Sequence, residues 1–589
     1  MARTAGPSEG SYFTDITTGQ DLWTAAFLNE RFPAPVTPLG WSLIRDPFER
    51  LALREPLAYL GHPSAQELRV TRLWHGHPYV AVEAFASLYK LLPDWLLPED
   101  AARYFPDGRT DLRRRARYPG SWLEPRLWRA AAGTLWRERG NWWPWHNDRG
   151  WARLRRSLDG EAEAVAAELP RATDPAELLA TTARLSDATA KLLAAHRWSL
   201  THADLWYSAL RRLGRTWLGQ GWQDRVVHLV RGAERVSVAL DAELHSLAAL
   251  AHQSPRAREA LAASTCLEEL RPRLVEDQVG QQLVDGIAYF MKTYGHRSFS
   301  LDIYQPSFAV APQQVFSLIL ALSGEPARSA PTAVGGNSIR LKRWQRPLFQ
   351  LVLGLARRYL ALREEQRFCW QSVLALQRAT FQRLGEEMAR NSALHAADDI
   401  YFLTTDEVAR LARTGDGIGR QLAEARHREY ATLVAEQRAD PATAYPPFLR
   451  GDVPLGATIG PTQDTMRGAP VSAGIAVGPV RVVRQAGELH SVRGGEVLVA
   501  PAVDPAWTPV FARIAALVTE AGGQLSHAAV VAREYGLPAV LGVPRATHNF
   551  HTGDMVRVDG SAGTVTRVRA AGEPGDADLM VGGEGAKSA

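Results

Sequence analysis

The pattern of hydrophobic and polar positions divides the chain into a long helical part and a shorter part that contains strands. From about residue 160 to residue 264, apolar side chains recur at three- and four-residue spacing, which predicts packed antiparallel helices. At residues 514–518 the pattern becomes a short apolar run before two glycines, which predicts a buried strand and a tight turn. We therefore expect a multidomain protein with a large, mostly α-helical domain and a C-terminal α/β domain.

A helix is predicted directly after this turn. Ser526 occupies an N-cap position, helical spacing starts at His527, and Gly536 and Pro538 end the helix. His527 then lies in a first turn, where free backbone N–H groups attract anions and disfavour a cationic imidazolium. A neutral imidazole is a nucleophile that can take a phosphoryl group. The alternative, a histidine that merely begins a helix, is the more frequent situation for a lone histidine.

Glycine, proline and threonine without periodicity mark a flexible linker between the two parts. The expected divisions are a helical domain at residues 1–455, the linker at 456–468, the C-terminal domain at 469–570 and a disordered tail at 571–589. Within the first domain, three prolines in six residues predict an extended segment, followed by a helix from near Leu39.

A second cluster of polar residues interrupts the helical pattern at Tyr294, Gly295, His296 and Arg297, and Asp302 follows shortly after. Arg297 could clamp phosphate oxygens bidentately while His296 polarises or deprotonates an acceptor hydroxyl. Alternatively, Arg297 and Asp302 form an ion pair that pins a loop. The spacing alone favours neither interpretation.

The composition excludes several classes of protein. With 46% hydrophobic and 22% charged residues, 589 residues can form several ordinary cores. The two cysteines, Cys266 and Cys369, lie far apart and form neither a disulfide framework nor a metal-ligand spacing, which indicates a reducing cytoplasm. The net charge of +5 is a small excess of 68 basic over 63 acidic residues, without any nucleic-acid-binding signature. We find no signal peptide and no membrane-spanning window.

The C-terminal part resembles a known family over about a hundred residues. The likeness starts at residues 468–480, expected to form the opening hairpin, continues through 504–509 and the Gly-Gly-x-Leu-Ser-His sequence at 522–527, and closes at 558–565. These motifs are similar to the phosphohistidine swivelling domain of the phosphoenolpyruvate (PEP)-utilising enzymes, which include PEP synthase and rifampin phosphotransferase. The resemblance implies a β/β/α fold, His527 as the carrier of a phosphoryl group, and phosphate binding by Gly522, Gly523 and Ser526.

The helical part resembles the acceptor-binding domain of rifampin phosphotransferase-like proteins more weakly. A similar Val-Thr-Pro stretch and a similar Tyr-Gly-His-Arg run occur there, and Arg363–Phe368 recurs as scaffold. By this resemblance, His296 and Arg297 join Ser526 and His527 in catalysis. The acceptor would contact Val36, Thr37, Pro38, Tyr294 and Asp302. The family's later acidic and arginine positions differ here, so a different acceptor is expected.

The chain shows no ATP-grasp module and no phosphate-binding Gly-x-x-x-x-Gly-Lys-Ser/Thr loop. The expected arrangement is that of phenylphosphate synthase, in which a separate ATP-grasp partner uses ATP and Mg²⁺ to charge the histidine. The present chain would hold no metal and no firmly bound cofactor. The acceptor would be a small apolar or natural-product-like compound of secondary metabolism, with a hydroxyl or an enolisable carbonyl. The alternatives are a condensation or dehydration in which phosphate leaves, and a non-catalytic binding protein.

Overall fold

The computed structural model describes most of the chain. The described residues are 11–17, 19–59, 68–90, 92, 97, 99–116, 125, 128–129, 132–133, 136, 144–219, 221–230, 235–323, 341–414, 418–455, 464–484, 486–503, 507, 510–511, 513–523 and 526–568. The predicted tail at 571–589 and residues 456–463 of the predicted linker lie outside these ranges.

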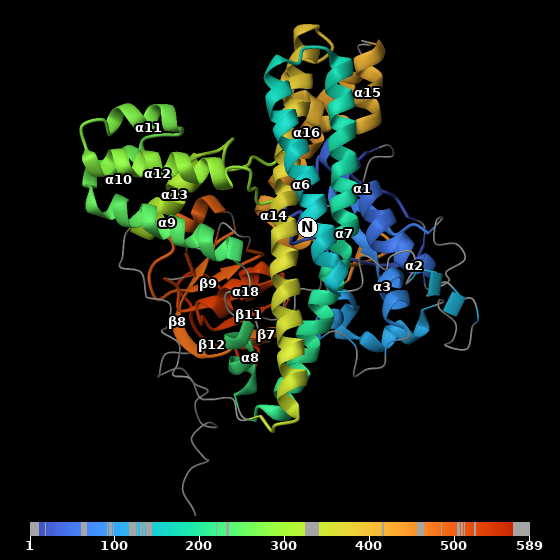
Figure 1. Ribbon diagram of the computed structural model, residues 1–589, viewed down its shortest axis with the longest axis vertical. Helices are drawn as coiled ribbons and strands as arrows, with labels where there is room; N and C mark the ends of the chain where they lie inside the picture. The colour runs from blue at the N-terminus through green and yellow to red at the C-terminus, as the bar shows by residue number, and fades with distance from the viewer. Residues whose placement is uncertain are drawn as a thin grey trace, which may run out of the picture.

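Three long helices form the spine of the larger part: α6 (Pro144–Glu168), α7 (Pro175–Trp217) and α14 (Gln345–Arg390). The last two pack side by side and run antiparallel, as the spacing of apolar residues predicts (Figure 1). The other helical segments of this part are α1 (Pro38–Phe48), η1 (Glu49–Arg54), α2 (Glu55–Tyr59), α3 (Val82–Tyr89), η2 (Glu99–Tyr104), η3 (Pro106–Gly108), η4 (Thr110–Arg115), η5 (Leu169–Arg171), α8 (Trp222–Val230), η6 (Ala397–Phe402), α15 (Thr405–Thr414), α16 (Ile418–Ala439) and α17 (Pro441–Ala444).

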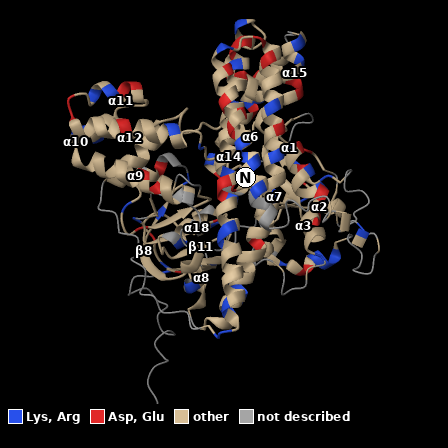
Figure 2. Cartoon of the chain, viewed as in Figure 1, with Lys and Arg blue, Asp and Glu red and all other residues tan. Residues whose placement is uncertain are grey.

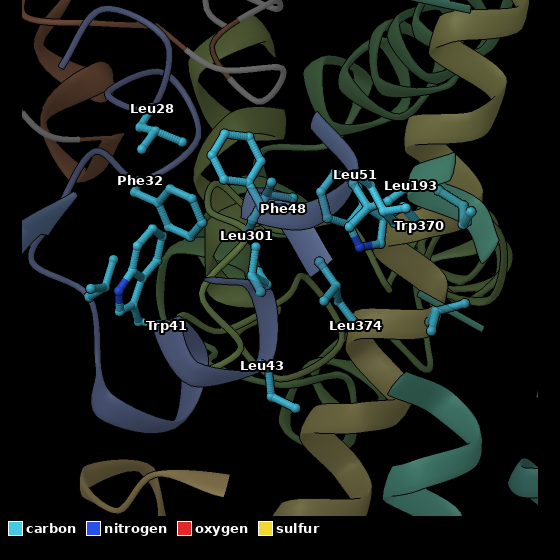
Figure 3. Close-up of a cluster of buried hydrophobic side chains, with 14 of the residues drawn as sticks. Leu28, Phe32, Trp41, Leu43, Phe48, Leu51, Leu193, Leu301, Trp370 and Leu374 are labelled. Carbon is cyan, nitrogen blue, oxygen red and sulfur yellow. The ribbon is translucent and has the colours of Figure 1, made fainter. Parts of the chain in front are cut away.

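The core of the larger part joins segments that are distant in the sequence. Large side chains from α1, α7 and α14 meet there, and Leu301 from a loop lies among them (Figure 3). Trp41 and Tyr359 are fully buried in this cluster. Burying a large apolar side chain contributes about 1.5–3 kcal/mol, so this core is the main source of stability for the helical part.

The larger part also contains a five-stranded sheet. The sequence pattern did not predict this sheet. Its order is β2-β3-β1-β4-β5. The strands are β1 (Leu22–Thr24), β2 (Thr71–Trp74), β3 (His77–Ala81), β4 (Phe448–Arg450) and β5 (Val453–Pro454). Trp23 pairs with Leu449, and the fully buried Arg72 donates to the Thr17 hydroxyl and the Gly451 carbonyl at 2.9 and 2.8 Å. The beginning and the end of the helical part therefore meet in one sheet.

His77 in this sheet gives a testable pH dependence. Its ring stacks on Tyr445 with centroids 3.9 Å apart, and burial lowers the pKa of His77 to about 3. Because the unfolded chain binds this proton with a pKa near 6.5, lowering the pH favours unfolding. We expect the free energy of unfolding to fall by about 2 kcal/mol between pH 7 and pH 5 through His77 alone.

Denaturant unfolding at both pH values checks this expectation. His77→Phe keeps an aromatic ring but cannot titrate, so its pH dependence should be smaller than that of the wild type by that amount. Equal pH dependence in the wild type and His77→Phe would refute the assignment.

Five shorter helices form a bundle on the other side of the spine (Figure 1). They are α9 (Arg235–Gln253), α10 (Pro255–Ala262), α11 (Leu267–Arg273), α12 (Gln278–Tyr294) and α13 (Gln313–Ser323). The bundle lies beside the C-terminal domain, and α13 packs against the short helix η7 (Ala486–Ser491) of that domain.

The C-terminal domain is built on an eight-stranded sheet of order β6-β13-β12-β8-β9-β10-β11-β7. Strands β8, β9, β10 and β11 are parallel to one another, because crossover connections join them. The remaining strand pairs of the sheet are antiparallel. The elements are β6 (Thr465–Arg467), β7 (Ala469–Ser472), β8 (Ile475–Val482), β9 (Val497–Ala500), β10 (Ala516–Thr519), α18 (His527–Glu534), β11 (Ala539–Leu541), α19 (Ala546–Asn549), β12 (Met555–Asp559) and β13 (Thr564–Arg567). The predicted α/β fold of this domain is confirmed.

Two details of this domain differ from the sequence-based expectation. The strands within residues 468–480 are not a hairpin, because β7 pairs with β11 while β8 pairs with β9 and β12. The end of the predicted linker is also wrong, because Thr465–Arg467 forms β6 and pairs with β13. Both pairings join segments far apart in the sequence, which local pattern does not reveal.

Charges of both signs are interspersed over the helices of both parts (Figure 2). This distribution agrees with the small net charge and with an ordinary solvated surface. None of the helices in the described ranges is both long and apolar enough to cross a membrane.

Candidate functional site

The turn after β10 and the start of α18 have the predicted geometry. Strand β10 is buried, and Gly522 adopts φ +119°, a conformation that an L side chain rarely adopts. Helix α18 begins at His527 with Ser526 as its N-cap, and the Ser526 hydroxyl accepts from the Ala529 N–H at 3.2 Å. At the other end, the Leu537 N–H donates to the Ala532 carbonyl at 2.8 Å and Gly536 has φ +61°, which is a Schellman stop.

This geometry places the backbone of His527 at the first position of a helix. The side chain of His527 and residues 524 and 525 lie outside the described part of the chain. The Ser526 hydroxyl also donates to the Gly523 carbonyl at 2.7 Å, so its visible role is to hold the turn and cap the helix. Phosphate binding by Gly522, Gly523 and Ser526 stays a prediction.

The Tyr294–Asp302 segment lies in the loop between α12 and α13. Tyr294 ends α12 and is buried. Arg297 is also buried, and its guanidinium lies 5.8 Å from the centre of the Phe368 ring on α14. The His296 ring lies edge-on against the same ring, with centroids 4.4 Å apart. The loop and α14 thus hold His296 and Arg297 against one aromatic side chain.

A small cavity of about 20 Å³, lined by His296, lies between the α12–α13 loop and α14. Two polar atoms on its walls, His296 Nε2 and Gln371 Oε1, have no hydrogen-bond partner among the described residues. The Gln371 Nε2 donates to the Ser298 carbonyl at 2.9 Å, so the orientation of the amide is fixed. An unsatisfied buried acceptor costs about 1–3 kcal/mol, so both atoms favour a bound group that donates hydrogen bonds.

The electrostatics of His296 suit an uncharged imidazole. Burial, followed by the nearby Arg297 cation, lowers the pKa of His296 to about 4, while a hydrogen bond to the Phe368 backbone opposes this shift. His296 is therefore neutral at pH 7 and can accept a proton. An anionic phosphoryl group nearby would raise the pKa of His296 toward the working pH.

Asp302 has a structural role that the sequence did not indicate. Its carboxylate accepts from the Thr37 N–H at 2.6 Å, the Thr37 hydroxyl at 2.8 Å and the Tyr304 N–H at 3.0 Å. Thr37 in turn caps α1, so the carboxylate lies at the N-terminus of that helix, where negative charge is favoured. Asp302 also lines the cavity. Burial raises the pKa of Asp302, and the hydrogen bonds from Thr37 and Tyr304, together with the charge of Arg378, oppose this shift.

The Val36–Pro38 stretch begins α1 as predicted, but its side chains lie in the core. Val36 and Thr37 are fully buried, and Pro38 is buried as well. In this arrangement Thr37 fixes Asp302, and none of the three residues lines the cavity. Contact of Val36, Thr37, Pro38 and Tyr294 with an acceptor stays a prediction.

Comparison with known proteins assigns both regions to families. Residues 492–563, which include His527, match the PEP-utilising enzyme mobile domain. Residues 196–364, which include His296 and Arg297, match the rifampicin phosphotransferase fourth domain. The chain combines these two domains. We call the C-terminal domain the mobile domain from here on.

Similar proteins include named phosphotransferases. A rifampicin phosphotransferase of Streptomyces sviceus is 30% identical over 309 residues, which is 49% of this chain and 34% of that protein. The uncharacterized phosphotransferase YvkC of Bacillus subtilis is 34% identical over 212 residues, 35% of this chain and 26% of that protein. Chondramide synthase cmdD of Chondromyces crocatus is 30% identical over 357 residues, 55% of this chain and 9% of that protein. The chain thus spans about a third or less of these relatives.

The structure adds functional candidates on α14 that the sequence analysis missed. Gln371 and Arg378 line the cavity and lie seven residues apart, on one face of the helix. The Arg378 guanidinium donates to the Tyr304 carbonyl at 2.5 Å. Arg378 therefore attaches the α12–α13 loop to α14. A glutamine at an inward-facing position of an amphipathic helix is the signal that would have revealed Gln371.

A group of cations adjoins this site. Burial lowers the pKa of His196 on α7 to about 3, and the charges of Arg31, Arg363 and Arg367 lower it further. Arg367 precedes Phe368, the residue that His296 and Arg297 contact. The charges of Arg363 and Arg367, which the sequence indicated only as scaffold, therefore act on the same buried histidine as that of Arg31.

No group of three or more metal-ligating side chains occurs within the ranges that the structure describes. The absence of a metal site in this chain remains a prediction from the sequence.

Proposed function

We propose that this protein transfers a phosphoryl group from His527 to a small acceptor held between the α12–α13 loop and α14. The observation that carries the proposal is the start of α18 at His527, directly after the Gly522 turn and capped by Ser526, within a PEP-utilising enzyme mobile domain. The free N–H groups of this first turn favour a neutral imidazole and an anionic phosphate.

The proposed chemistry uses the side chains described above. The P–N bond of phospho-His527 breaks while a P–O bond forms to the acceptor hydroxyl, whose proton passes to a base such as His296. Arg297 and the cations of α14 neutralise charge on the transferring group, which requires an in-line approach. The acceptor is a small, largely apolar compound with a hydroxyl or an enolisable carbonyl.

His527 is charged from ATP and Mg²⁺ by an ATP-grasp protein on a separate chain. The mobile domain then travels between that protein and the acceptor site. We propose this step from the resemblance of the sequence to phenylphosphate synthase, whose charging subunit is a separate protein.

A second candidate is a biosynthetic reaction in which the transferred phosphate leaves, giving a condensed or dehydrated product. The similarity to chondramide synthase over 55% of this chain favours a setting in natural-product biosynthesis. Product analysis distinguishes the two: a stable phosphate ester supports simple transfer, and free phosphate with a modified acceptor supports the second candidate.

Mass spectrometry under alkaline conditions tests the proposal. The chain is incubated with ATP and Mg²⁺, with and without candidate ATP-grasp proteins from the same source. We expect an acid-labile phosphate on the peptide that contains His527 only when a partner is present. Labelling of the chain alone would reveal a nucleotide site in this chain, and no labelling with any partner would favour a non-catalytic binding protein.

A further inference from the structure

The two large hydrophobic cores of the molecule do not follow the predicted domain boundary. The first core belongs to the spine and the N-terminal region. The second joins the bundle α9–α13 to the mobile domain in one continuous cluster. Its members include Leu247, Ile287 and Ile319 from the bundle and Leu498 and Phe511 from the mobile domain, all at most 2% exposed. Separating the bundle from the mobile domain would therefore expose apolar side chains on both sides.

Polar contacts also join the bundle to the mobile domain. The Tyr535 hydroxyl, just after α18, donates to the Asp241 carboxylate on α9. Arg513 donates to the Ala321 carbonyl near the end of α13. The two contacts lie at different helices of the bundle, so they oppose rotation as well as separation.

The contacts between the mobile domain and the spine have a different character. His548 Nε2 lies 2.9 Å from the Asp440 carboxylate, between α19 and the start of α17, and both side chains are partly exposed. The Arg533 guanidinium lies 5.5 Å from the centre of the Tyr207 ring on α7. The His548–Asp440 contact is partly exposed and can be exchanged for water at little cost, whereas the Arg533 and Tyr207 side chains are buried.

The bundle meets the spine through the α12–α13 loop and also directly, because α9 contacts α14 and Phe368 of α14 packs against the second core. Leu301 and Ile303 of this loop lie in the first core, where Figure 3 shows Leu301 among side chains of α1 and α14. We call the base of the loop, residues 295–297 and 308–309, the neck. Two backbone hydrogen bonds join its two segments: the Phe308 N–H donates to the Arg297 carbonyl at 2.9 Å, and the Ala309 N–H donates to the Gly295 carbonyl at 2.8 Å. The neck thus lies where the two cores meet.

We propose that the bundle α9–α13 and the mobile domain move together as one body, with the neck of the α12–α13 loop as the pivot. The moving unit is then about twice the size of the mobile domain alone. His296 and Arg297 are part of this neck. Each movement of the mobile domain therefore also shifts these two residues relative to Phe368 on α14. The inference concerns motion alone and does not depend on the proposed reaction.

Distance measurements between pairs of spin labels test this proposal on the full chain. The background carries Cys266→Ser, since Cys369 is buried and resists labelling. Labels at the exposed positions Val275 and Met555 span the bundle and the mobile domain. Labels at Leu348 and Met555 span the spine and the mobile domain, and labels at Leu348 and Val453 report on the larger part alone.

Asp440→Ala removes the contact with His548 and is expected to broaden or shift the Leu348–Met555 distribution. The Val275–Met555 and Leu348–Val453 distributions should stay as narrow as in the parent. Asp241→Ala is the matched control, because it also removes one carboxylate; the shared apolar core should keep the Val275–Met555 distribution narrow.

Two results would overturn the proposal. If Val275–Met555 broadens together with Leu348–Met555 in Asp440→Ala, the mobile domain leaves the bundle and moves alone. If Leu348–Met555 does not change in Asp440→Ala, the composite body does not move about the neck. Neither result bears on whether His527 carries phosphate, so failure here is distinct from failure of the proposed function.

Discussion

His527→Ala is expected to abolish phosphoryl transfer, by at least about a thousandfold, and to leave the fold intact. Transfer fails because no other group takes the covalent intermediate. The fold persists because Ser526 still caps α18 and alanine favours a helix more than histidine does. Phosphoramidate, which phosphorylates histidine chemically, removes the need for the charging partner in this test.

The readout is an acid-labile phosphate on the His527 peptide, measured under alkaline conditions, and its loss when acceptors are added. His551→Ala is the control, because His551 is an exposed histidine of the same domain. It should label and discharge like the wild type. Full turnover by His527→Ala, with the acid-labile phosphate on another residue, would end the proposed mechanism.

Asp302→Ala is expected to destabilise the protein by about 2–4 kcal/mol. The change removes the acceptor for the Thr37 N–H, the Thr37 hydroxyl and the Tyr304 N–H, and leaves these donors buried. Helix α1 packs closely on the Asp302 carboxylate through Gly40, so the change also leaves a space at this contact. A Cβ at Gly40 would lie only 1.9 Å from Asp302 Oδ1.

Denaturant unfolding of the full chain measures this effect. Asp302→Asn keeps one acceptor oxygen and should lose roughly half as much stability, about 1–2 kcal/mol. Asp46→Ala, at an exposed carboxylate on the same helix, should stay within about 0.5 kcal/mol of the wild type. If Asp302→Ala instead unfolds like the wild type and impairs only acceptor binding, Asp302 is a substrate-binding residue, as the sequence resemblance implies.

The carrier segment could be predicted from the sequence because its signals are local. The apolar strand, the positive φ at Gly522, the Ser526 cap and the Gly536 stop all depend on residues within a few positions of one another. The start of α1 near Leu39 was predictable for the same reason, since prolines restrict their immediate neighbours.

The acceptor side could be predicted only in part, because its contacts are distant in sequence. Thr37 and Asp302 are 265 positions apart, and no local pattern links them. The cavity depends on Gln371, a residue of α14 that is polar where the helix faces inward. The second core was also hidden, since helical spacing shows that α9–α13 have an apolar face but does not show which surface covers it.

The pairing of β1 with β4 brings the beginning and the end of the helical part together in space. Residues 22–24 and 448–450 lie side by side, and Arg72 bonds to segments near both. A unit whose entry and exit points adjoin can be inserted into a host polypeptide like a cassette, with little disturbance to either.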